Sequence, residues 1–286
     1  MNTWILGARP RTLPAAIAPV IVGVAIAQPT FNFINALLAL IVGLALQIAV
    51  NYANDYSDGV KGTDADRVGP MRLVGSGAAN ADAVKKAAFI SFFIAALAGL
   101  ILASRTSWLL IILGAICIIA AWNYTGGPKP YGYQAMGEVS VFIFFGVVAT
   151  VGTYYVQTES ISREVLLASF AMGALACAIL VLNNLRDLPK DDVAGKKTLA
   201  VVMGDKSTRD LYKWLMFFAL VMSVALSFFS FFYLFALISL PLISKSVRAV
   251  NAGASGSSLI GLLAMTGRIQ IIYAVALSFA AWLVAR

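Results

Sequence analysis

The chain contains no histidine, only two cysteines and few charged side chains. Its 286 residues include 12% Asp, Glu, Lys and Arg, whereas soluble domains carry about 25%. Without histidine, a Ser-His-Asp triad, an HExxH zinc site and histidine-ligated haem are excluded. Cys117 and Cys177 each lie in an apolar run, so we expect neither a disulfide framework nor a CxxC metal site. Any chemistry must therefore use Asp, Glu, Lys, Arg, Tyr, Asn or a bound ion.

Apolar residues are abundant, at 60% of the chain with a mean hydropathy of +0.87. This composition excludes a soluble enzyme and a disordered chain. A membrane-spanning helix needs about 20 mostly apolar residues. Nine apolar runs predict an all-α membrane protein with about nine transmembrane helices, forming one domain over residues 1–286: 12–28, 33–54, 84–104, 107–123, 135–156, 164–184, 211–228, 230–247 and 268–285.

Basic residues predict the orientation, because membrane proteins concentrate Lys and Arg in cytoplasmic loops. With nine crossings and a cytoplasmic N-terminus, eighteen Lys and Arg fall inside, and only Arg105, Arg163 and Arg286 fall outside. Counting 211–247 as one span gives fifteen against six, a weaker bias. The net charge of +8 therefore indicates a membrane protein rather than a nucleic-acid partner. We expect substitutions of Arg105 and Arg163 to have little effect, since both lie on the far side.

Acidic residues gather in two of the polar segments that we expect to be cytoplasmic, 55–83 and 185–210. At the spacing of an α-helix, the Asn and Asp residues at each of these two places fall on one face of their helix. Stacked carboxylates near a helix C-terminus repel one another and oppose the helix dipole, and a divalent cation relieves both penalties. Carboxylate oxygens with water and phosphate are the ligands of Mg²⁺, so we predict a Mg²⁺ site. The two sets are Gln47, Asn51, Asn54, Asp55 and Asp58, and Asn183, Asn184, Asp187 and Asp191.

Basic residues lie among these acids. Ammonium and guanidinium groups beside a bound cation suit a diphosphate, whose remaining oxygens they hold. The preference of membrane proteins for basic cytoplasmic loops is the competing explanation for each of them. The candidate diphosphate-binding residues are Lys61, Arg67, Arg72, Lys190, Lys196 and Lys197.

A third polar segment, 124–134, carries Tyr124, Tyr131, Tyr133 and Lys129 in a turn rich in Pro and Gly. Aromatic rings at a membrane surface often form an interfacial belt. Alternatively, these rings wall an aromatic pocket and stabilise a carbocation through their faces.

These segments resemble a known family. Asn54-Asp-Tyr-Ser-Asp58 resembles the first aspartate-rich motif of the intramembrane aromatic prenyltransferases, the family of 4-hydroxybenzoate polyprenyltransferase, and Asp187-Leu-Pro-Lys-Asp191 resembles the second. The strings 54–70, 124–133, 183–187 and 195–199 are similar to the branch that prenylates 1,4-dihydroxy-2-naphthoate in menaquinone biosynthesis. The resemblance runs from the Arg9-Pro-Arg-Thr-Leu-Pro14 string to about Gly204. The family's third Asp is Gly62 here, and Asp64 or Asp66 is the candidate to replace it.

The resemblance implies a helical bundle around a central cavity that cytoplasmic loops cap, in a bacterial plasma membrane. It implies transfer of a polyprenyl group from an allylic polyprenyl diphosphate to 1,4-dihydroxy-2-naphthoate, with release of diphosphate and CO₂ to give demethylmenaquinone or its quinol. The implied metal ligands are Asn54, Asp55, Asp58, Asp64, Asp187 and Asp191. The implied catalytic residues are Asp55, Asp58, Asp187, Asp191 and Lys129. The acceptor would contact Asn51, Tyr124, Tyr131 and Tyr133, and its carboxylate would pair with Lys129, Arg9 or Arg11.

Three alternatives remain open at this point. A sister enzyme acting on another aromatic acceptor, such as 4-hydroxybenzoate, shares the metal chemistry. A phospholipid-type phosphotransferase also uses acidic pairs. A transporter for Mg²⁺ or an anion is the alternative without catalysis, although transport sites tend to lie near the membrane midplane, whereas these acids lie at helix ends.

Overall fold

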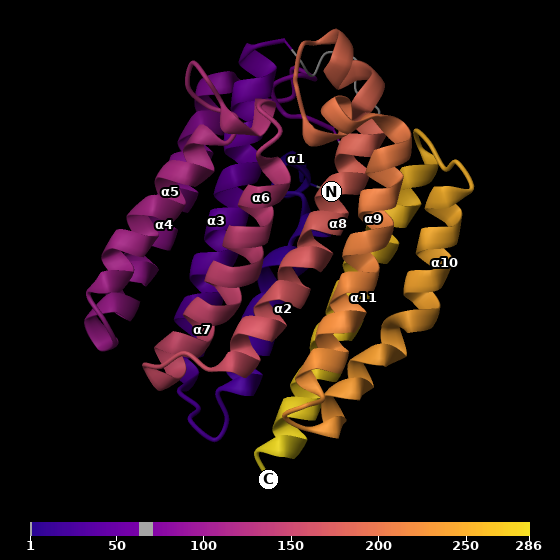
Figure 1. The fold of residues 1–286 in the computed structure, drawn as a ribbon. Helices are drawn as coiled ribbons and strands as arrows, with labels where there is room; N and C mark the ends of the chain where they lie inside the picture. Colours follow the sequence, from indigo (N-terminus) through magenta and orange to yellow (C-terminus); the bar gives the residue numbers. More distant parts are fainter. Residues whose placement is uncertain (1, 63–70) are drawn as a thin grey trace.

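The computed structural model describes residues 2–62 and 71–286 as a bundle of long helices. Successive long helices run in alternating directions between the two ends of the bundle (Figure 1). The first part of the chain contains α1 (Thr3–Gly7), η1 (Pro10–Thr12), α2 (Pro14–Ile26), α3 (Phe33–Val60), α4 (Ala81–Arg105) and α5 (Leu109–Asn123). The remainder contains η2 (Tyr131–Tyr133), α6 (Gly137–Val141), the π-helix η3 (Phe142–Val148), α7 (Ala149–Thr158), α8 (Arg163–Val193), α9 (Leu199–Leu226), η4 (Phe231–Ser239), α10 (Leu240–Asn251) and α11 (Ser258–Val284).

The all-helical membrane class is confirmed, whereas the count of nine spans is not. Among the described residues, six helices are long and apolar enough to cross a membrane: Phe33–Val60, Ala81–Arg105, Gly137–Thr158, Arg163–Val193, Phe231–Asn251 and Ser258–Val284. The pair Thr3–Thr12 and Pro14–Ile26, bent by 51°, makes a seventh if it is one span. Each of the nine predicted runs is helical. However, α5 has only 15 residues, and α9 places three charged residues, Arg209, Asp210 and Lys213, beside its apolar part.

Side-chain caps and glycines set where the helices begin and end. The side chains of Asn32, Asn80, Ser162 and Thr198 each accept a hydrogen bond from a backbone N–H in the first turn of α3, α4, α8 and α9. Both helices that carry aspartate motifs end at a glycine in the left-handed region, Gly62 after α3 and Gly195 after α8, with φ of 73° and 69°. The acidic residues therefore lie within the last turns of these two helices.

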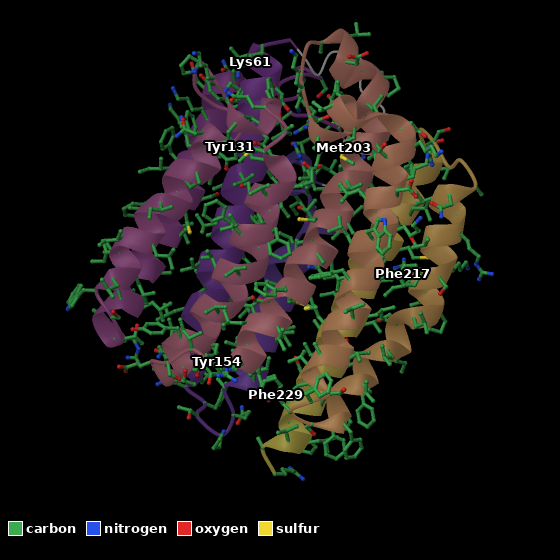
Figure 2. All side chains as sticks on the ribbon, viewed as in Figure 1. Lys61, Tyr131, Tyr154, Met203, Phe217 and Phe229 are labelled. Atoms are coloured by element: carbon green, nitrogen blue, oxygen red, sulfur yellow. The ribbon has the colours of Figure 1, made fainter. Side chains whose placement is uncertain are left out.

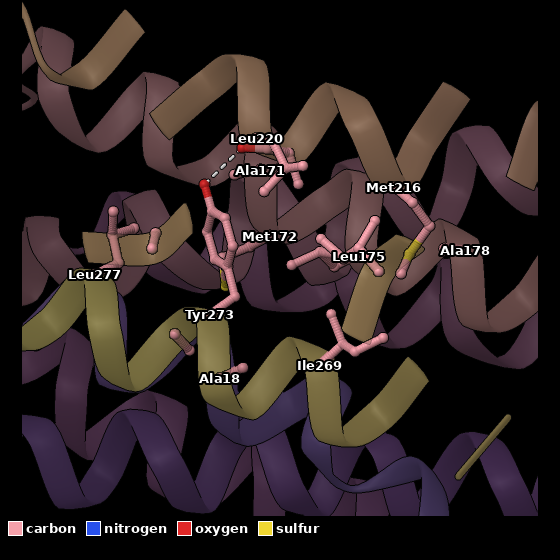
Figure 3. Packing of buried hydrophobic residues seen from close by; sticks show 14 of the residues in the cluster. Ala18, Ala171, Met172, Leu175, Ala178, Met216, Leu220, Ile269, Tyr273 and Leu277 are labelled. Carbon is pink, nitrogen blue, oxygen red and sulfur yellow. Dashed lines mark hydrogen bonds between the residues drawn. The ribbon is translucent and has the colours of Figure 1, made fainter. Parts of the chain in front are cut away.

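The largest apolar core lies among α2, α8, α9, α10 and α11. Met172 and Leu175 on α8 pack in one cluster with Met216 on α9 and Tyr273 on α11 (Figure 3). The Tyr273 hydroxyl donates to the carbonyl oxygen of Ala219 at 2.7 Å, which satisfies a polar atom inside this core. In α8, 78% of the most apolar window is buried, which explains why this helix is apolar all round.

The other half of the bundle, built from α2 to α7, buries fewer apolar side chains, in two smaller clusters. α4 and α5 expose apolar side chains along much of their length, as expected for helices that face lipid. Lys61 and Tyr131 lie toward one end of the bundle and Tyr154 toward the other (Figure 2). We call the end that contains the last turns of α3 and α8 the motif end.

Candidate active site

The three polar segments singled out by the sequence meet at the motif end (Figure 1). α3 and α8 both end there, and α5 leads into the 124–136 loop at the same end. The backbone N–H of Ala135 donates to the carbonyl oxygen of Lys197 at 2.9 Å. This contact fixes the loop after α5 to the loop after α8.

Tyr133 joins residues from all three segments. Its hydroxyl donates to Oδ1 of Asp58 at 2.5 Å. The Nζ atoms of Lys61 and Lys196 lie 4.9 and 4.8 Å from its ring centroid, within the range of cation–π contacts. The sequence analysis assigned Tyr133 to the acceptor pocket, whereas the structure places it on the acidic cluster.

The carboxylate of Asp58 is buried among cations. Its Oδ2 lies 3.6 Å from Nη2 of Arg72 and 3.7 Å from Nζ of Lys196, and only 1% of the residue is exposed. Arg72 and Lys196 thus lie together beside one carboxylate. Guanidinium and ammonium groups are also the usual donors to phosphate oxygens.

One turn before Asp58, Asn54 is tied to the 124–136 loop. Its Oδ1 accepts a hydrogen bond from the Thr125 hydroxyl at 2.7 Å, and Lys61 Nζ donates to the Thr125 carbonyl oxygen at 2.8 Å. The loop and the end of α3 therefore hold Asn54 and Lys61 in fixed positions.

Asp55 makes contacts of a different kind. Its Oδ2 accepts the backbone N–H of Leu73 at 2.8 Å, and its Oδ1 accepts that of Val74 at 3.0 Å. A Cβ atom at Gly59 would lie 2.5 Å from side-chain atoms of Val74, so only glycine fits there. Asp55 thus anchors the segment after residue 70 against α3, a role that the spacing of the motif did not predict.

In the second motif, Arg186 forms a two-pronged ion pair with its neighbour Asp187. Nε and Nη2 of Arg186 each lie 2.8 Å from a carboxylate oxygen of Asp187, and both residues are buried. The carbonyl oxygen of Asp191 accepts the backbone N–H of Lys196 at 2.8 Å, which closes the loop after α8. This loop brings Lys196 next to Asp58.

A cavity of about 310 Å³ extends from the motif end into the bundle. Its wall is polar near the motif end and apolar further in, where side chains of α2, α3, α5 and α7 line it. The polar part includes Arg9, Asn51, Asn54, Tyr124, Tyr131 and Asn183. Of the predicted polar face of α3, Gln47, Asn51 and Asn54 line this cavity, whereas Asp55 and Asp58 do not.

Arg9 is held at the polar end of this cavity by its backbone. The Asn51 side chain donates to the Ala8 carbonyl oxygen at 2.9 Å, and Arg9 itself has a φ of 52°, in the left-handed region. Its Nη2 is buried and has no hydrogen-bond partner among the residues that the structure describes. A buried N–H group without a partner is costly, and an anionic ligand would satisfy this nitrogen.

Two tyrosines of the cavity wall stay protonated at neutral pH. Burial raises the pKa of Tyr131, and a hydrogen bond with Ser140 only partly opposes this. Burial, followed by the charge of Glu138, raises the pKa of Tyr124. Both phenols therefore serve as uncharged walls and hydrogen-bond donors rather than as bases.

The comparisons with known proteins agree with this arrangement. The model of the UbiA prenyltransferase family matches residues 16–251. The chain belongs to this family. This confirms the resemblance seen in the sequence.

Relatives of this UbiA chain include proteins named 1,4-dihydroxy-2-naphthoate octaprenyltransferase. The one from Mycobacterium tuberculosis is 49% identical over 96% of this chain and 95% of its own. The one from Escherichia coli is 40% identical over 80% of this chain and 77% of its own. The UbiA homologue from Archaeoglobus fulgidus bound to GPP and Mg²⁺ superposes with a TM-score of 0.71, at 15% identity, covering 98% of this chain and 99% of its own. At that identity the likeness shows the UbiA fold alone.

The structure does not bring every predicted residue of this UbiA site to the cavity. Lys129, Arg11, Lys190 and Lys197 are exposed, and neither Lys129 nor Arg11 lines the cavity. Asp64, Asp66 and Arg67 lie outside the described residues. Within residues 2–62 and 71–286, no group of three or more Asp, Glu, His or Cys is arranged to hold a metal ion.

The sequence analysis missed Glu138, a buried acid at the start of α6. Its Oε1 accepts a hydrogen bond from Asn184 at 2.9 Å, whereas its buried Oε2 has no partner within the described part of the chain. Gly137 beside it abuts the Tyr124 hydroxyl, 3.0 Å from where a Cβ would be. An ionisable residue within a membrane-spanning segment is by default a candidate functional residue, and this rule could have identified Glu138 from the sequence. Glu138 stands alone in an apolar run, without the paired spacing of the two aspartate motifs.

Proposed function

We propose that this chain transfers a polyprenyl group from an allylic diphosphate to 1,4-dihydroxy-2-naphthoate, with loss of diphosphate and CO₂. One observation carries the proposal: a cavity with a long apolar wall begins at Asn54 and Tyr124, next to the helix end and loop where Asp58, Arg72 and Lys196 gather. This combination suits a substrate with a charged head and an isoprenoid tail. The names of relatives at 40–49% identity support the naphthoate acceptor.

The diphosphate would bind among Arg72, Lys61 and Lys196, which gather around Asp58 and Tyr133. These cations would hold its oxygens and stabilise the negative charge that grows as the C1–O bond breaks. Lys190 and Lys197, exposed at the same end, would attract the anion from solution.

The carboxylate and amide oxygens at the motif end are of the type that binds Mg²⁺. We assign its coordination to Asn54 and Asp58 on α3 and to Asp187 and Asp191 on α8, with Asp64 as a further candidate. Because Mg²⁺ rarely takes an all-protein cage, diphosphate oxygens and water would complete the set. When bound, Mg²⁺ neutralises diphosphate charge and polarises the leaving group. We keep Asp55 as a candidate ligand too, since a carboxylate oxygen that accepts one backbone N–H has a second lone pair.

The acceptor carboxylate would pair with Arg9, whose buried Nη2 lies at the polar end of the cavity. Arg9 is preferred to Arg11 and Lys129, because both of those side chains are exposed. A planar guanidinium recognises a carboxylate through two parallel hydrogen bonds.

The rings of Tyr124 and Tyr131 would flank the allylic cation while the naphthoate ring attacks its C1. Attack by the ring carbon that carries the carboxylate forms the new C–C bond, and loss of CO₂ returns the electron pair to the ring. This sequence needs no base, which suits a chain without histidine and with protonated phenols in the cavity wall.

An assay on purified protein in detergent tests this proposal. With radiolabelled octaprenyl diphosphate, 1,4-dihydroxy-2-naphthoate and Mg²⁺, we expect a lipid-soluble prenylated product that disappears when EDTA is added. Replacing the acceptor with 4-hydroxybenzoate should give no product. Product with 4-hydroxybenzoate alone would contradict the acceptor, and no product with either would contradict the proposed reaction.

A further inference from the structure

A short segment, residues 133–138, contacts the helix ends that carry both aspartate motifs. We call this segment the brace. Its first residue, Tyr133, donates its hydroxyl hydrogen to Asp58 on α3. Two further residues of the brace, Ala135 and Glu138, bond to the loop after α8 and to α8 itself. The brace therefore links the end of α3 to the end of α8.

The second aspartate motif depends on such contacts, because a proline lies inside it. Pro189 stands between Asp187 and Asp191, within the helix α8. Proline has no N–H, so this residue donates no hydrogen bond to the carbonyl oxygen of Leu185, four positions earlier. The last turn of α8, with Asp191, is thus held less firmly by α8 itself and relies more on neighbouring segments.

The brace holds α8 on both sides of Pro189. Before the proline, Nδ2 of Asn184 donates to Oε1 of Glu138 at 2.9 Å. After the proline, the backbone N–H of Ala135 donates to the carbonyl oxygen of Lys197 at 2.9 Å. Ala135 and Glu138 are three positions apart, so a single short segment spans the weak point of α8.

The backbone of the brace is itself fixed by its surroundings. Ala135 has a φ of 56°, in the left-handed region that residues other than glycine rarely adopt. The Cys177 thiol donates to the carbonyl oxygen of Glu138 at 3.0 Å, and α6 packs along α8 (Figure 1). A Cβ atom at Gly137 would lie 3.0 Å from the Tyr124 hydroxyl oxygen and 3.3 Å from Leu180, which shows how closely the brace fits.

Glu138 is the brace residue whose side chain acts on α8. Only 8% of this residue is exposed, and its Oε2 has no partner among the residues that the structure describes. Burying a carboxyl group costs more than burying an apolar side chain. What this group provides is an acceptor for Asn184, and an apolar side chain at position 138 would leave that amide without it.

We propose that Glu138 is a positioning residue, which acts through Asn184 to hold α8 where the two aspartate motifs have the spacing that a metal–diphosphate complex needs. This inference rests on the proposed function, in which such a complex contacts both motifs at once. It adds a residue that contacts neither substrate and lies outside both motifs.

Comparison of Glu138→Ala with Glu138→Gln tests the role without turnover. The probe is the Mn²⁺ complex of inorganic diphosphate, with binding to purified protein in detergent measured by electron paramagnetic resonance. We expect Glu138→Ala to weaken binding about five- to tenfold, the effect of one lost hydrogen bond. Glu138→Gln should bind within about twofold of the unchanged protein, because its amide oxygen still accepts from Asn184. Asn184→Ala should match Glu138→Ala, and the double variant should bind no more weakly than either.

Glu164→Ala is the matched control. Glu164 is an acid at the opposite end of the same helix, α8, where its Oε1 accepts the Tyr233 hydroxyl at 3.2 Å. This variant loses a hydrogen bond of α8 far from the motifs and should bind the probe like the unchanged protein. Equal losses in Glu138→Ala and Glu164→Ala, or no loss in Glu138→Ala, would overturn the positioning role.

Hydrogen–deuterium exchange separates this role from the proposed reaction, because it needs no ligand. In the metal-free protein, backbone amides of residues 190–199 should exchange about fivefold faster in Glu138→Ala, and at the unchanged rate in Glu138→Gln and Glu164→Ala. Faster exchange and weaker probe binding, in a protein that transfers no prenyl group, would support the positioning role and reject the proposed reaction. Unchanged exchange in Glu138→Ala would overturn the positioning role even if prenyl transfer is observed.

Discussion

At the scale of single residues, two aspartates three positions apart differ in what they contact. Asp55 accepts hydrogen bonds from the backbone of Leu73 and Val74, whereas Asp58 contacts Tyr133 and two cations. Helical spacing predicted that both face the same region, and it did not predict this division. The backbone partners of Asp55 lie in the segment that holds Leu73 and Val74. The motif sequence does not determine where this segment runs in the folded protein.

Substitution of each aspartate by asparagine should separate the two roles. In Asp55→Asn, an amide replaces one oxygen that accepts a backbone N–H, so we expect a loss of about 1–3 kcal/mol in stability. Asp58→Asn should change thermal unfolding less and reduce turnover at least a hundredfold, because it removes negative charge from the cluster proposed to bind Mg²⁺ and diphosphate. Thermal unfolding and initial rates over a range of Mg²⁺ concentrations measure both effects. Unchanged unfolding in Asp55→Asn, or unchanged rates in Asp58→Asn, would contradict the assignment.

Tyr133 offers a second test at this scale. Tyr133→Phe keeps the ring beside Lys61 and Lys196 and removes the hydroxyl that donates to Asp58. A hydrogen bond to a charged group contributes about 1.5–3 kcal/mol, so we expect kcat to fall about tenfold to a hundredfold. Tyr56→Phe is the control, since the Tyr56 ring is also approached by a lysine, Lys85, but stacks on Trp122. Equal rates in the two variants would show that the Tyr133 hydroxyl has no part in the reaction.

At the scale of helices, the faces were predictable and the contacts between loops were not. Gln47, Asn51 and Asn54 line the cavity as their spacing predicted, because helical periodicity fixes which residues share a face. On α8 the same reasoning was incomplete: Asn183 lines the cavity, whereas Asn184 bonds to Glu138. The periodicity of residues within one helix does not predict where a neighbouring helix lies.

At the end of the bundle opposite the motif end, two hydrogen bonds of Asn35 that the sequence did not predict link three helices. We call this pair of bonds the polar clamp. Arg105 Nε donates to Asn35 Oδ1 at 2.8 Å, and Asn35 Nδ2 donates to the Val156 carbonyl oxygen at 2.6 Å. These bonds tie the start of α3 to the end of α4 and the end of α7 near the apolar end of the cavity. We therefore expect Arg105 to contribute to stability, in contrast to the expectation from the sequence that its substitution has little effect.

Arg105→Ala should lower the free energy of unfolding by about 1 kcal/mol, because its hydrogen bond to Asn35 comes from a solvent-exposed side chain. Affinity for Mg²⁺ and for the acceptor should stay unchanged, because the clamp lies far from the motif end. Arg163→Ala is the matched control, since Arg163 is exposed at the start of α8 and should unfold like the unchanged protein. Thermal unfolding in the same detergent measures the difference, and identical curves for both variants would refute the clamp.

At the scale of the whole molecule, the two halves of the bundle have different roles. α8 to α11 with α2 form the largest apolar core, while α2 to α8 enclose the cavity. Composition was enough to predict an all-helical membrane protein, and the motif strings were enough to predict the family. The number of spans was not predictable, because the short α5 and the charged start of α9 lie near the limits of length and apolarity.

The orientation of the bundle rests on the eighteen-to-three distribution of basic residues and can be tested directly. Val193 is 91% exposed at the motif end, and Ser160 is exposed at the opposite end. We expect a membrane-impermeant maleimide to label Val193→Cys in inverted vesicles and Ser160→Cys in right-side-out vesicles. Cys177 is buried and Cys117 lies within α5, so neither native thiol should react with an impermeant reagent, and detergent should expose both introduced cysteines equally. The reverse pattern would place the motif end outside the cell. The basic residues around the aspartates would then have to be explained by diphosphate binding alone, because the membrane topology would no longer account for them.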